Sequence, residues 1–324
     1  MKPLVLAGYL HDWIDPDFGI PPLRLGAVPG CWDEVIVAFA EVAADGVVTL
    51  PALPIAASER DLAAQVKRLR AAGRRVAFSI GGARAGLFLD DRTRRNFVAS
   101  VCQLLDQHAF DGIDFDLESK CDLTQPGNAR NVRDAIAEIT AARAVRIVFT
   151  PEWPAVQGGF ARMAGYWGSQ LWLLNELRDA IHSVRVQYYN NADMPTPCSR
   201  RPARSGSAAQ LLAGSRMLME GFPLASGGWF EGLRPGQVGL AVASSRRAAH
   251  NGFSEPHEVA AAIDGIRQLS TARGGPDDVE LAIWSIDWSA LERDEFVGEL
   301  LRCASGDEQE PPAAACASSS VPAT

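Results

Sequence analysis

The stretch Asp111-Gly112-Ile113-Asp114-Phe115-Asp116-Leu117-Glu118 alternates apolar and acidic side chains from Ile113 onward. Successive side chains of a β-strand point to opposite faces, so Asp114, Asp116 and Glu118 share one face and the apolar residues share the other. A solvent-exposed amphipathic strand gives the same alternation, but three like charges with no basic residue between them repel each other. The pattern therefore predicts a strand whose acidic face lines a functional site.

The spacing of these carboxylates predicts unusual protonation. Asp116 and Glu118 are separated by roughly 6–7 Å, because each strand residue rises ~3.3 Å. Carboxylates crowded in this way do not all ionise, so we expect a retained or shared proton. Glu118 is last in the row and is the candidate general acid with a raised pKa. Asp111 faces the other way and is assigned a structural role.

Short apolar runs that resemble strands alternate with helical patterns along most of the chain. The predicted strands are residues 4–9, 34–40, 75–80, 112–118, 146–150, 184–189, 237–242 and 280–286. The predicted helices are residues 58–72, 91–108, 128–142, 167–181, 207–219, 257–273 and 289–303. Such alternation favours parallel βα units, and eight strands can close a (β/α)8 TIM barrel with catalytic residues at their carboxyl ends. A doubly wound open sheet is the alternative, although Gly81-Gly82 lacks the spacing of a dinucleotide-binding loop.

These patterns predict one α/β domain over residues 1–303. Residues 304–324 form a low-complexity Ala/Ser/Pro tail that we expect to be disordered. The first ten residues are interpreted as a buried strand rather than a signal peptide, since no small-residue cleavage site follows them. The localisation is therefore left open, with secretion expected if a signal has been trimmed.

The composition excludes several functions. The 324 residues carry 31 basic and 39 acidic side chains, a net charge of −8, which argues against a nucleic-acid or anionic membrane surface. No apolar run reaches the ~18–20 residues that a membrane helix needs. The six cysteines include no CxxC pair and the five histidines show no ligand spacing, so no metal and no cofactor is predicted.

The octapeptide at 111–118 resembles the DxxDxDxE signature of family 18 glycoside hydrolases, the chitinase family. Four more segments are similar to the bacterial chitinase D-type and plant class III group: FSIGG at 78–82, PEW with VQGG between 151 and 159, VQYYN at 186–190, and WSIDW at 284–288. The resemblance spans residues 4 to about 300 and implies a (β/α)8 barrel. Its implied partner is chitin or chitooligosaccharides, bound by a monomer.

The resemblance also implies a retaining mechanism in which the substrate supplies the nucleophile. Glu118 would protonate the glycosidic oxygen while the sugar's own 2-acetamido carbonyl attacks the anomeric carbon. Asp116 would orient the acetamido N–H and stabilise the cationic oxazolinium intermediate. Tyr189 would donate its hydroxyl to the acetamido oxygen, and Asp114 would hold Asp116. A cationic intermediate needs a nearby anion, and the acid must reach the leaving oxygen, so the chemistry is consistent.

Several further residues are substrate-binding candidates. Trp284 ends the last predicted strand and would form the stacking floor of the central subsite. The other candidates are the aromatic residues Tyr9, Trp13, Phe39 and Trp153, with Trp229 in a loop, and the polar residues Glu152, Gln187 and Asn190. For the aromatic residues, simple packing in the core is the alternative. Ser79, Gly81 and Gly82 are predicted to allow close approach of chains beneath the site.

This sequence departs from the resembling group in two places. The interval between the last two predicted strands is about 40 residues and one helix fills most of it, leaving no room for the α+β insertion of processive members. We therefore expect an open groove and endo-acting cleavage. Gly239-Leu240-Ala241-Val242 lacks the proline usual in the group. Cys121 and Cys198 both fall in loops at the predicted catalytic face, where a disulfide is one hypothesis.

Two alternatives to a chitinase stay open at this point. An endo-N-acetylglucosaminidase acting on N-glycans would use the same substrate-assisted chemistry, because that chemistry requires only a 2-acetamido group. A chitin-binding lectin on a retired catalytic frame is the second, although such relatives usually lose the glutamate or an aspartate. This chain keeps Asp114, Asp116, Glu118 and Tyr189 together.

Overall fold

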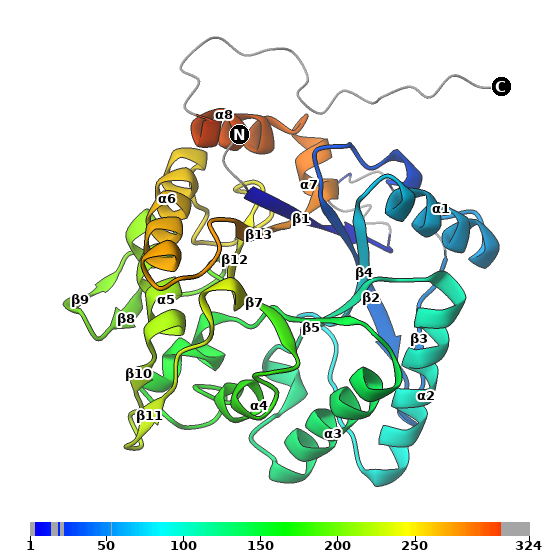
Figure 1. Cartoon of the computed structure of the whole chain (residues 1–324), viewed down its shortest axis with the longest axis horizontal. Coiled ribbons are helices and arrows are strands. Elements are labelled where there is room, and N and C mark those ends of the chain that lie inside the picture. Colours follow the sequence, from blue (N-terminus) through cyan, green and yellow to red (C-terminus); the bar gives the residue numbers. More distant parts are fainter. Residues whose placement is uncertain (1–3, 14–18, 20–22, 53, 306–324) are drawn as a thin grey trace.

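Eight parallel strands form a closed barrel surrounded by helices (Figure 1). This computed structural model describes residues 4–13, 19, 23–52 and 54–305. The barrel strands are β1 (Leu4–His11), β2 (Glu34–Val42), β4 (Arg75–Gly81), β5 (Gly112–Asp116), β6 (Arg146–Phe149), β7 (Ile181–Gln187), β12 (Val238–Ala243) and β13 (Val279–Trp284). They pair in chain order, and β1 pairs with both β2 and β13, which closes the barrel. The predicted (β/α)8 fold is confirmed, and the open sheet is excluded.

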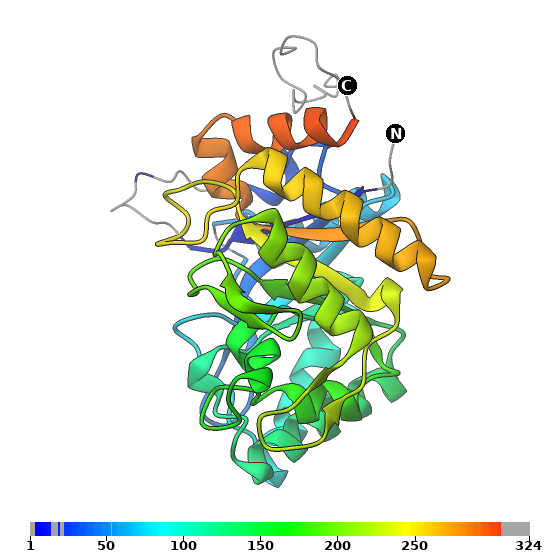
Figure 2. The same cartoon turned by 90° about the vertical axis from the view of Figure 1, so that its left-hand side faces the viewer.

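The helices pack against the outside of the barrel. They are α1 (Glu59–Ala71), α2 (Asp91–His108), α3 (Pro126–Ala142), α4 (Leu171–Glu176), α5 (Ala208–Glu220), α6 (Pro256–Ala272), α7 (Ile286–Leu291) and α8 (Glu295–Ser305). Figure 2 shows α5, α6 and α8 side by side along one flank. Helix α1 begins where predicted, because the Ser58 hydroxyl accepts a hydrogen bond from the backbone of Asp61. In the part of the chain described, no helix is both long and apolar enough to span a membrane.

Two predicted helices differ from the structure. The helix predicted over 167–181 is reduced to α4, because Gly168 adopts a φ of +72°, outside the helical region. The helix predicted over 289–303 is divided into α7 and α8, because Arg293 and Asp294 both have a φ of +57°. Helix α8 continues two residues beyond the predicted domain end at 303, so residues 304 and 305 of the tail predicted over 304–324 are helical, and its residues 306–324 lie outside the described residues.

Short elements decorate the barrel. The additional strands are β3 (Val48–Thr49), β8 (Met194–Thr196), β9 (Ser199–Ala203), β10 (Phe222–Pro223) and β11 (Trp229–Phe230). The 3-10 helices are η1 (Leu25–Ala27), η2 (Ser119–Cys121), η3 (Trp153–Ala155), η4 (Gln157–Phe160) and η5 (Pro235–Gln237). Residues 244–278, all described, place only α6 between β12 and β13, so the α+β insertion is absent there, as predicted.

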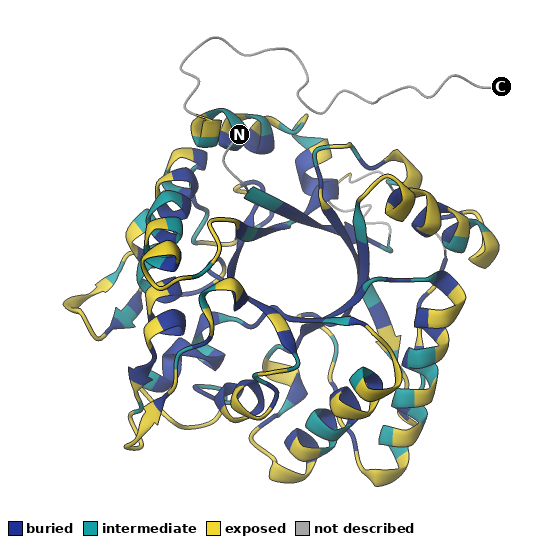
Figure 3. Cartoon of the chain, viewed as in Figure 1, coloured by how far each residue is buried: buried dark blue, intermediate teal, exposed yellow. Residues whose placement is uncertain are grey.

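The strands bury side chains on both faces (Figure 3). Their outer faces and the helices form a large core of Leu, Ile, Val and Phe side chains. The inner faces form a second cluster with many small residues: Ala7, Ala38, Ala77, Ala241, Ala243 and Ala282. Alternation along each strand separates the two sets. The small inner residues leave space inside the barrel for larger polar side chains.

The amino-terminal end of the barrel interior is closed by ion pairs. Arg185 on β7 is fully buried and binds Glu34 at 2.6 Å and Glu280 at 2.9 Å. Arg75 reaches the same two carboxylates from β4, and Arg146 binds Glu280 from β6. The arginine charges lower the pKa of Glu280 to about 2, although burial alone would raise it. Five strands are therefore joined across the barrel by one charged layer.

The buried ion pairs predict a large effect of removing their central cation. Arg185→Met should reduce the free energy of unfolding by about 3–5 kcal/mol, because it leaves Glu34 as a buried carboxylate with a weakened partner set. Urea denaturation followed by circular dichroism measures this change. Arg143→Met is the matched control, since Arg143 pairs with Asp106 at the exposed surface and its loss should change stability little. Equal stabilities for the two variants would contradict the prediction.

Candidate active site

Three carboxylates rise along one face of β5 toward the carboxyl end of the barrel. Asp114 and Asp116 lie inside the barrel with only 1% and 5% of their surface exposed. The strand ends at Asp116, so Glu118 lies just beyond it and is partly exposed. Asp111 instead binds Arg70 and the backbone N–H of Val76, which confirms its structural role.

Asp114 is held by donors from three other strands or their ends. The hydroxyls of Ser79 and Thr150 each donate to one carboxylate oxygen at 2.6 Å. The Tyr9 hydroxyl lies 3.0 Å from Asp114 and 2.9 Å from Thr150. Burial raises the pKa of Asp114, and the bonds from Ser79 and Thr150 oppose this rise. These contacts fix Asp114 at the centre of the barrel.

Asp116 is oriented by Gln187. The Gln187 amide donates to Asp116 at 2.7 Å and to the Thr150 carbonyl at 3.0 Å. Gln187 also pairs with Glu152 through a parallel β-bridge. This bridge continues the contact between β6 and β7 past the strand ends and brings Glu152 to the same face as Glu118. The predicted polar residues Gln187 and Glu152 thus belong to the carboxylate site.

The electrostatics of the site favour protonated carboxyl groups. Burial is the main reason that the pKa of Asp116 rises well above its ordinary value, and the charges of Glu118, Asp114 and Glu152 raise it further. Burial and the neighbouring charge of Glu152 raise the pKa of Glu118 to about 7. A carboxyl with a pKa near neutrality can hold a proton for donation, as a general acid requires.

Tyr189 faces the same cluster. Its side chain is buried, and its pKa is raised by burial and by the charges of Asp116, Glu118, Glu152 and Asp114. The phenol therefore remains protonated and can donate a hydrogen bond into the space bordered by these carboxylates. Its position after β7, near the strand end, agrees with the sequence prediction.

Gly81 and Gly82 permit the close packing beneath this site. Gly81 has a φ of +127°, and a Cβ there would overlap the Asp116 carbonyl. A Cβ on Gly82 would lie 2.8 Å from the Phe39 ring. The Gly82 N–H donates to that Asp116 carbonyl at 2.7 Å. The predicted close approach of chains is confirmed.

Aromatic side chains form a cluster beside the carboxylates. The Trp284 ring lies 5.5 Å from Tyr9, 5.8 Å from Phe39 and 6.2 Å from Trp13, measured between ring centroids. The rings of Trp13 and Phe39 are nearly parallel, at 9°. Trp13, Phe39 and Trp284 are only partly buried, so their surfaces border the barrel mouth. Tyr9 is buried and contacts Asp114, which makes it a supporting residue.

Three predicted binding residues make other contacts or lie on other segments. Trp153 is 1% exposed and packs edge-on against Trp167 at 5.4 Å, so it offers no open face for a sugar. Trp229 is exposed, but it lies on the β10–β11 hairpin. This hairpin belongs to the connection from α5 to β12, which leads into the amino-terminal end of a barrel strand rather than away from its carboxyl end. The exposed Asn190 accepts a hydrogen bond from the backbone of His250 and thereby orders a loop. These contacts support packing and loop order.

The hypothesis of a disulfide between Cys121 and Cys198 is not borne out. Both thiols are free in the structure. Cys121 is buried, and burial raises its pKa to about 12, whereas Cys198 is exposed on the turn between β8 and β9. A shared face of the barrel did not bring the two sulfur atoms together.

Two residues of the site were missed by sequence reasoning. Thr150 binds Asp114 and lies one residue after β6, in register with the inner face. Alternation along that strand carried enough information to find it. Tyr166 interacts with Glu152, and burial raises its pKa. It belongs to the irregular segment before α4, where no periodicity marked it.

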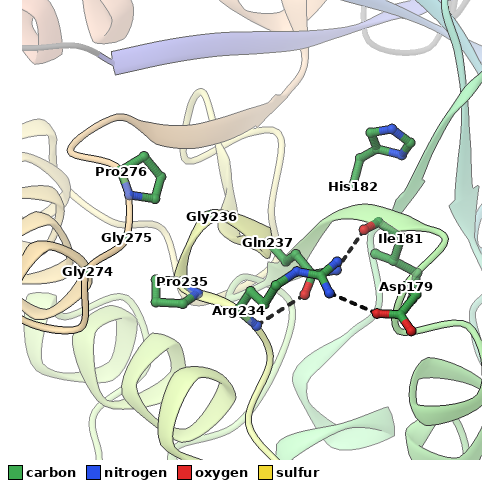
Figure 4. Close-up of a pocket in the computed structure, with 10 residues that line it drawn as sticks. All are labelled: Asp179, Ile181, His182, Arg234, Pro235, Gly236, Gln237, Gly274, Gly275 and Pro276. Atoms are coloured by element: carbon green, nitrogen blue, oxygen red, sulfur yellow. Dashed lines mark hydrogen bonds and ion pairs between the residues drawn. The ribbon is translucent and has the colours of Figure 1, made fainter.

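Figure 4 shows a separate pocket of about 560 Å³. It is lined by residues that precede β7, β12 and β13, among them Asp179, Gln237 and Pro276. It therefore lies at the amino-terminal end of the barrel, opposite the carboxylates. Arg234 in this pocket is already paired with Asp179 at 2.9 Å. Among the described residues, no cluster of His, Cys, Asp or Glu side chains is arranged to hold a metal ion.

Comparison with known proteins agrees with this geometry. The model of the glycosyl hydrolases family 18 matches residues 5–221. The structure is similar to a family GH18 chitinase from Chromobacterium violaceum, with 33% identity, a TM-score of 0.85, and coverage of 93% of this chain and 83% of that one. The chain belongs to family 18 of the glycosyl hydrolases.

Curated relatives with longer chains are also similar. Chitinase Chi52 of Paenibacillus xylanexedens and Chitinase D of Niallia circulans are each 29% identical over 90% of this chain. The chain spans 60% of the length of each of these relatives. A xylanase and alpha-amylase inhibitor protein from Scadoxus multiflorus shares the fold at 18% identity and a TM-score of 0.60. The barrel alone therefore does not determine activity, and the side chains of the site must decide.

The glycine beneath Asp116 gives a prediction about assembly of the site. Gly81→Ala should destabilise the protein and disturb the carboxylate site, because the new Cβ displaces the end of β5 that carries Asp116. Thermal unfolding and near-ultraviolet circular dichroism measure the effect. Gly73→Ala is the control, since Gly73 also has a positive φ, but its Cβ would meet no atom within 4 Å. A Gly81→Ala protein no less stable than this control would contradict the prediction.

Proposed function

We propose that this protein is an endo-acting retaining chitinase that hydrolyses β-1,4 bonds between N-acetylglucosamine units. The observation that carries the proposal is the row Asp114, Asp116 and Glu118, buried progressively less toward the mouth, with Tyr189 facing it. The two longer curated relatives are named chitinases, and so is the similar Chromobacterium structure. The proposed partners are chitin and chitooligosaccharides, bound by a monomer.

Glu118 is the proposed general acid and base. Its pKa of about 7 keeps it protonated in mildly acidic solution, and its partial exposure lets a glycosidic oxygen reach it. After donating this proton, the carboxylate can accept one from the water that completes hydrolysis. The 2-acetamido carbonyl of the substrate serves as nucleophile, so no enzyme nucleophile is required.

Asp116 and Tyr189 are proposed to hold the acetamido group. The Asp116 carboxylate accepts the acetamido N–H and opposes the positive charge of the oxazolinium ion, while the Tyr189 phenol donates to the acetamido oxygen. Gln187 fixes one Asp116 oxygen, so the other is available to the substrate. Asp114 lies one layer below and supports Asp116 through the rigid strand. Glu118 and Tyr189 act in the protonated state that the site favours, whereas Asp116 must be ionised, so the proton that the crowded carboxyl groups retain must lie on a neighbour of Asp116 when the cation forms.

The aromatic cluster is proposed as the sugar floor. Trp284, with Trp13 and Phe39 at its edge, presents apolar ring faces beside the carboxylates. Such faces suit the apolar side of a pyranose ring. Because only α6 connects β12 to β13, no added domain walls the groove, which supports internal cleavage of soluble or short chains.

The first experiment uses the N-acetylglucosamine hexamer, with products identified by mass spectrometry. The wild-type protein should release dimers and trimers. Glu118→Gln should lower kcat by at least a thousandfold, since it keeps the shape and removes the proton, while binding is retained. Glu299→Gln, an exposed site on α8, is the matched control and should cleave normally. More than a tenth of wild-type turnover in Glu118→Gln would rule out this acid.

The two alternative functions, a chitin-binding lectin and an endo-N-acetylglucosaminidase, predict different outcomes of the same experiment. A hexamer that stays intact but raises the melting temperature indicates a lectin. No cleavage and no binding directs the test to N-glycans, where an endo-N-acetylglucosaminidase would release the core sugar. Dimers as the sole early product indicate cleavage from a chain end and contradict the endo mode.

The pH profile tests the state of Glu118. Activity requires the protonated acid, so kcat should fall as the pH rises through about 7. Glu152→Gln removes a negative charge that raises this pKa, and the alkaline limb should therefore move to lower pH by about 0.5–1 unit. Initial rates between pH 4 and 10 measure the limb, again with Glu299→Gln as control. A limb that moves to higher pH in Glu152→Gln would contradict the assignment.

A further inference from the structure

A buried acid–imidazole pair lies behind the aromatic floor and is not used by the mechanism above. His11 is the last residue of β1, and Asp287 is the second residue of α7. One Asp287 oxygen, Oδ2, accepts a hydrogen bond from the backbone N–H of His11 at 2.8 Å. The same oxygen lies 3.9 Å from His11 Nδ1, and the two side chains are only 1% and 3% exposed.

Three polar atoms of the pair have no hydrogen-bond partner within the described part of the chain. Among the described residues, Asp287 Oδ1 and both ring nitrogens of His11 are buried without a hydrogen bond. Buried polar atoms of this kind cost free energy, and an ionised carboxylate costs more than a neutral one. When the pair holds one proton between its two groups, the group that carries the proton becomes a hydrogen-bond donor and the other group remains an acceptor. The separation of 3.9 Å is longer than a hydrogen bond, but it is short enough for the two groups to titrate as a coupled pair.

The imidazole contacts both indoles of the floor. The His11 ring stacks on Trp13 with centroids 4.2 Å apart and an interplanar angle of 11°. It also lies 4.9 Å from the centroid of Trp284. Asp287 follows Trp284 by three residues and ties α7 to the end of β1. The pair therefore packs directly against both indoles of the floor.

Other ionisable groups on the surrounding segments have their own contacts. Asp12 accepts a hydrogen bond from the backbone of β2 at 3.0 Å. Arg247 lies over the Trp288 ring at 5.3 Å, and Asp294 binds the Ser289 hydroxyl. Burial raises the pKa of Asp287 to about 7, although backbone N–H groups lower it. Burial lowers the pKa of His11 to about 3.

We propose that Asp287 and His11 are positioning residues that share one proton and hold Trp284 and Trp13 in the arrangement that binds sugar. Loss of this proton leaves an uncompensated carboxylate behind the floor and weakens chitooligosaccharide binding. The proposal rests on the proposed function for its ligand. It adds a protonation event in the binding of sugar that is separate from the protonation of Glu118.

The test measures binding without turnover. Affinity for the N-acetylglucosamine tetramer is measured by calorimetry on Glu118→Gln between pH 5.5 and 8.5, where the acid itself no longer titrates. We expect the affinity to fall about tenfold over this range. Adding Asp287→Asn keeps the shape and the acceptor for the His11 N–H but removes the titrating proton, so the fall should shrink to threefold or less. An undiminished fall in the double variant overturns the proposal.

Two further variants separate the pair from its neighbours. Asp12→Asn on the Glu118→Gln background is the matched control, because burial also raises the pKa of Asp12 to about 7 one residue away. It should leave the tenfold fall unchanged, and if it removes the fall, Asp12 is the group responsible. His11→Gln should move the midpoint of the fall by at least half a pH unit. An unmoved midpoint overturns the role of His11.

A measurement without sugar distinguishes this proposal from the proposed function. A carboxyl whose pKa is raised in the folded state stabilises the fold at low pH, and that stability is lost as the pH rises toward the folded-state pKa. The melting temperature of Asp287→Asn relative to wild type should therefore increase from pH 5 to pH 8. A constant difference shows that Asp287 holds no extra proton and overturns the proposal, whatever the protein binds. A rising difference with no tetramer binding instead contradicts the proposed function.

Discussion

The desolvation of Asp114 is the constraint on which the site depends. A carboxyl group at the centre of a barrel loses its water, and this loss is acceptable only where donors replace it. Here Ser79, Thr150 and Tyr9 supply them from three other strands or strand ends, so the hydrogen bonds exist only when the barrel is closed. Closure of the barrel therefore also forms the hydrogen bonds that hold Asp114 in the site. The alanines of the inner wall leave room for this network, and Asp116 is positioned one layer above it.

Charge in the barrel is arranged in layers. The arginine-rich layer at the amino-terminal end carries Arg185, which also lowers the pKa of Asp114. Farther along the barrel, burial and neighbouring negative charges raise the pKa values of Asp116 and Glu118. The strand direction thus sets a gradient from paired, ionised groups to crowded groups that retain protons. This gradient is what a donor of protons at the barrel mouth needs.

Alternation along strands made much of the fold and the site predictable. Every second residue of a strand faces the barrel interior, so the spacing of Asp114, Asp116 and Glu118 placed them on one face. The same argument would have identified Thr150. Loops follow no such period. Trp153 was predicted as a sugar platform because it lies after a strand, but its packing on Trp167 depends on how residues 150–170 fold back. The hypothesis of a disulfide between Cys121 and Cys198 failed for the same reason, because two loops on one face of the barrel need not bring their sulfur atoms together.

The ion pairs at the amino-terminal end of the barrel limit how molecules can enter its interior. Because Arg185 and Glu34 are buried there, the barrel interior is closed at its amino-terminal end and is reached from its carboxyl end. Under the proposed function, sugar, water and protons would therefore all enter at the carboxyl end of the barrel, beside Trp284. In the proposed cycle, Glu118 regains its proton from the water that completes hydrolysis, and a bound chain would cover the opening through which that water enters. Departure of the first product and entry of that water would then be steps in series, both taking place at the mouth of the barrel.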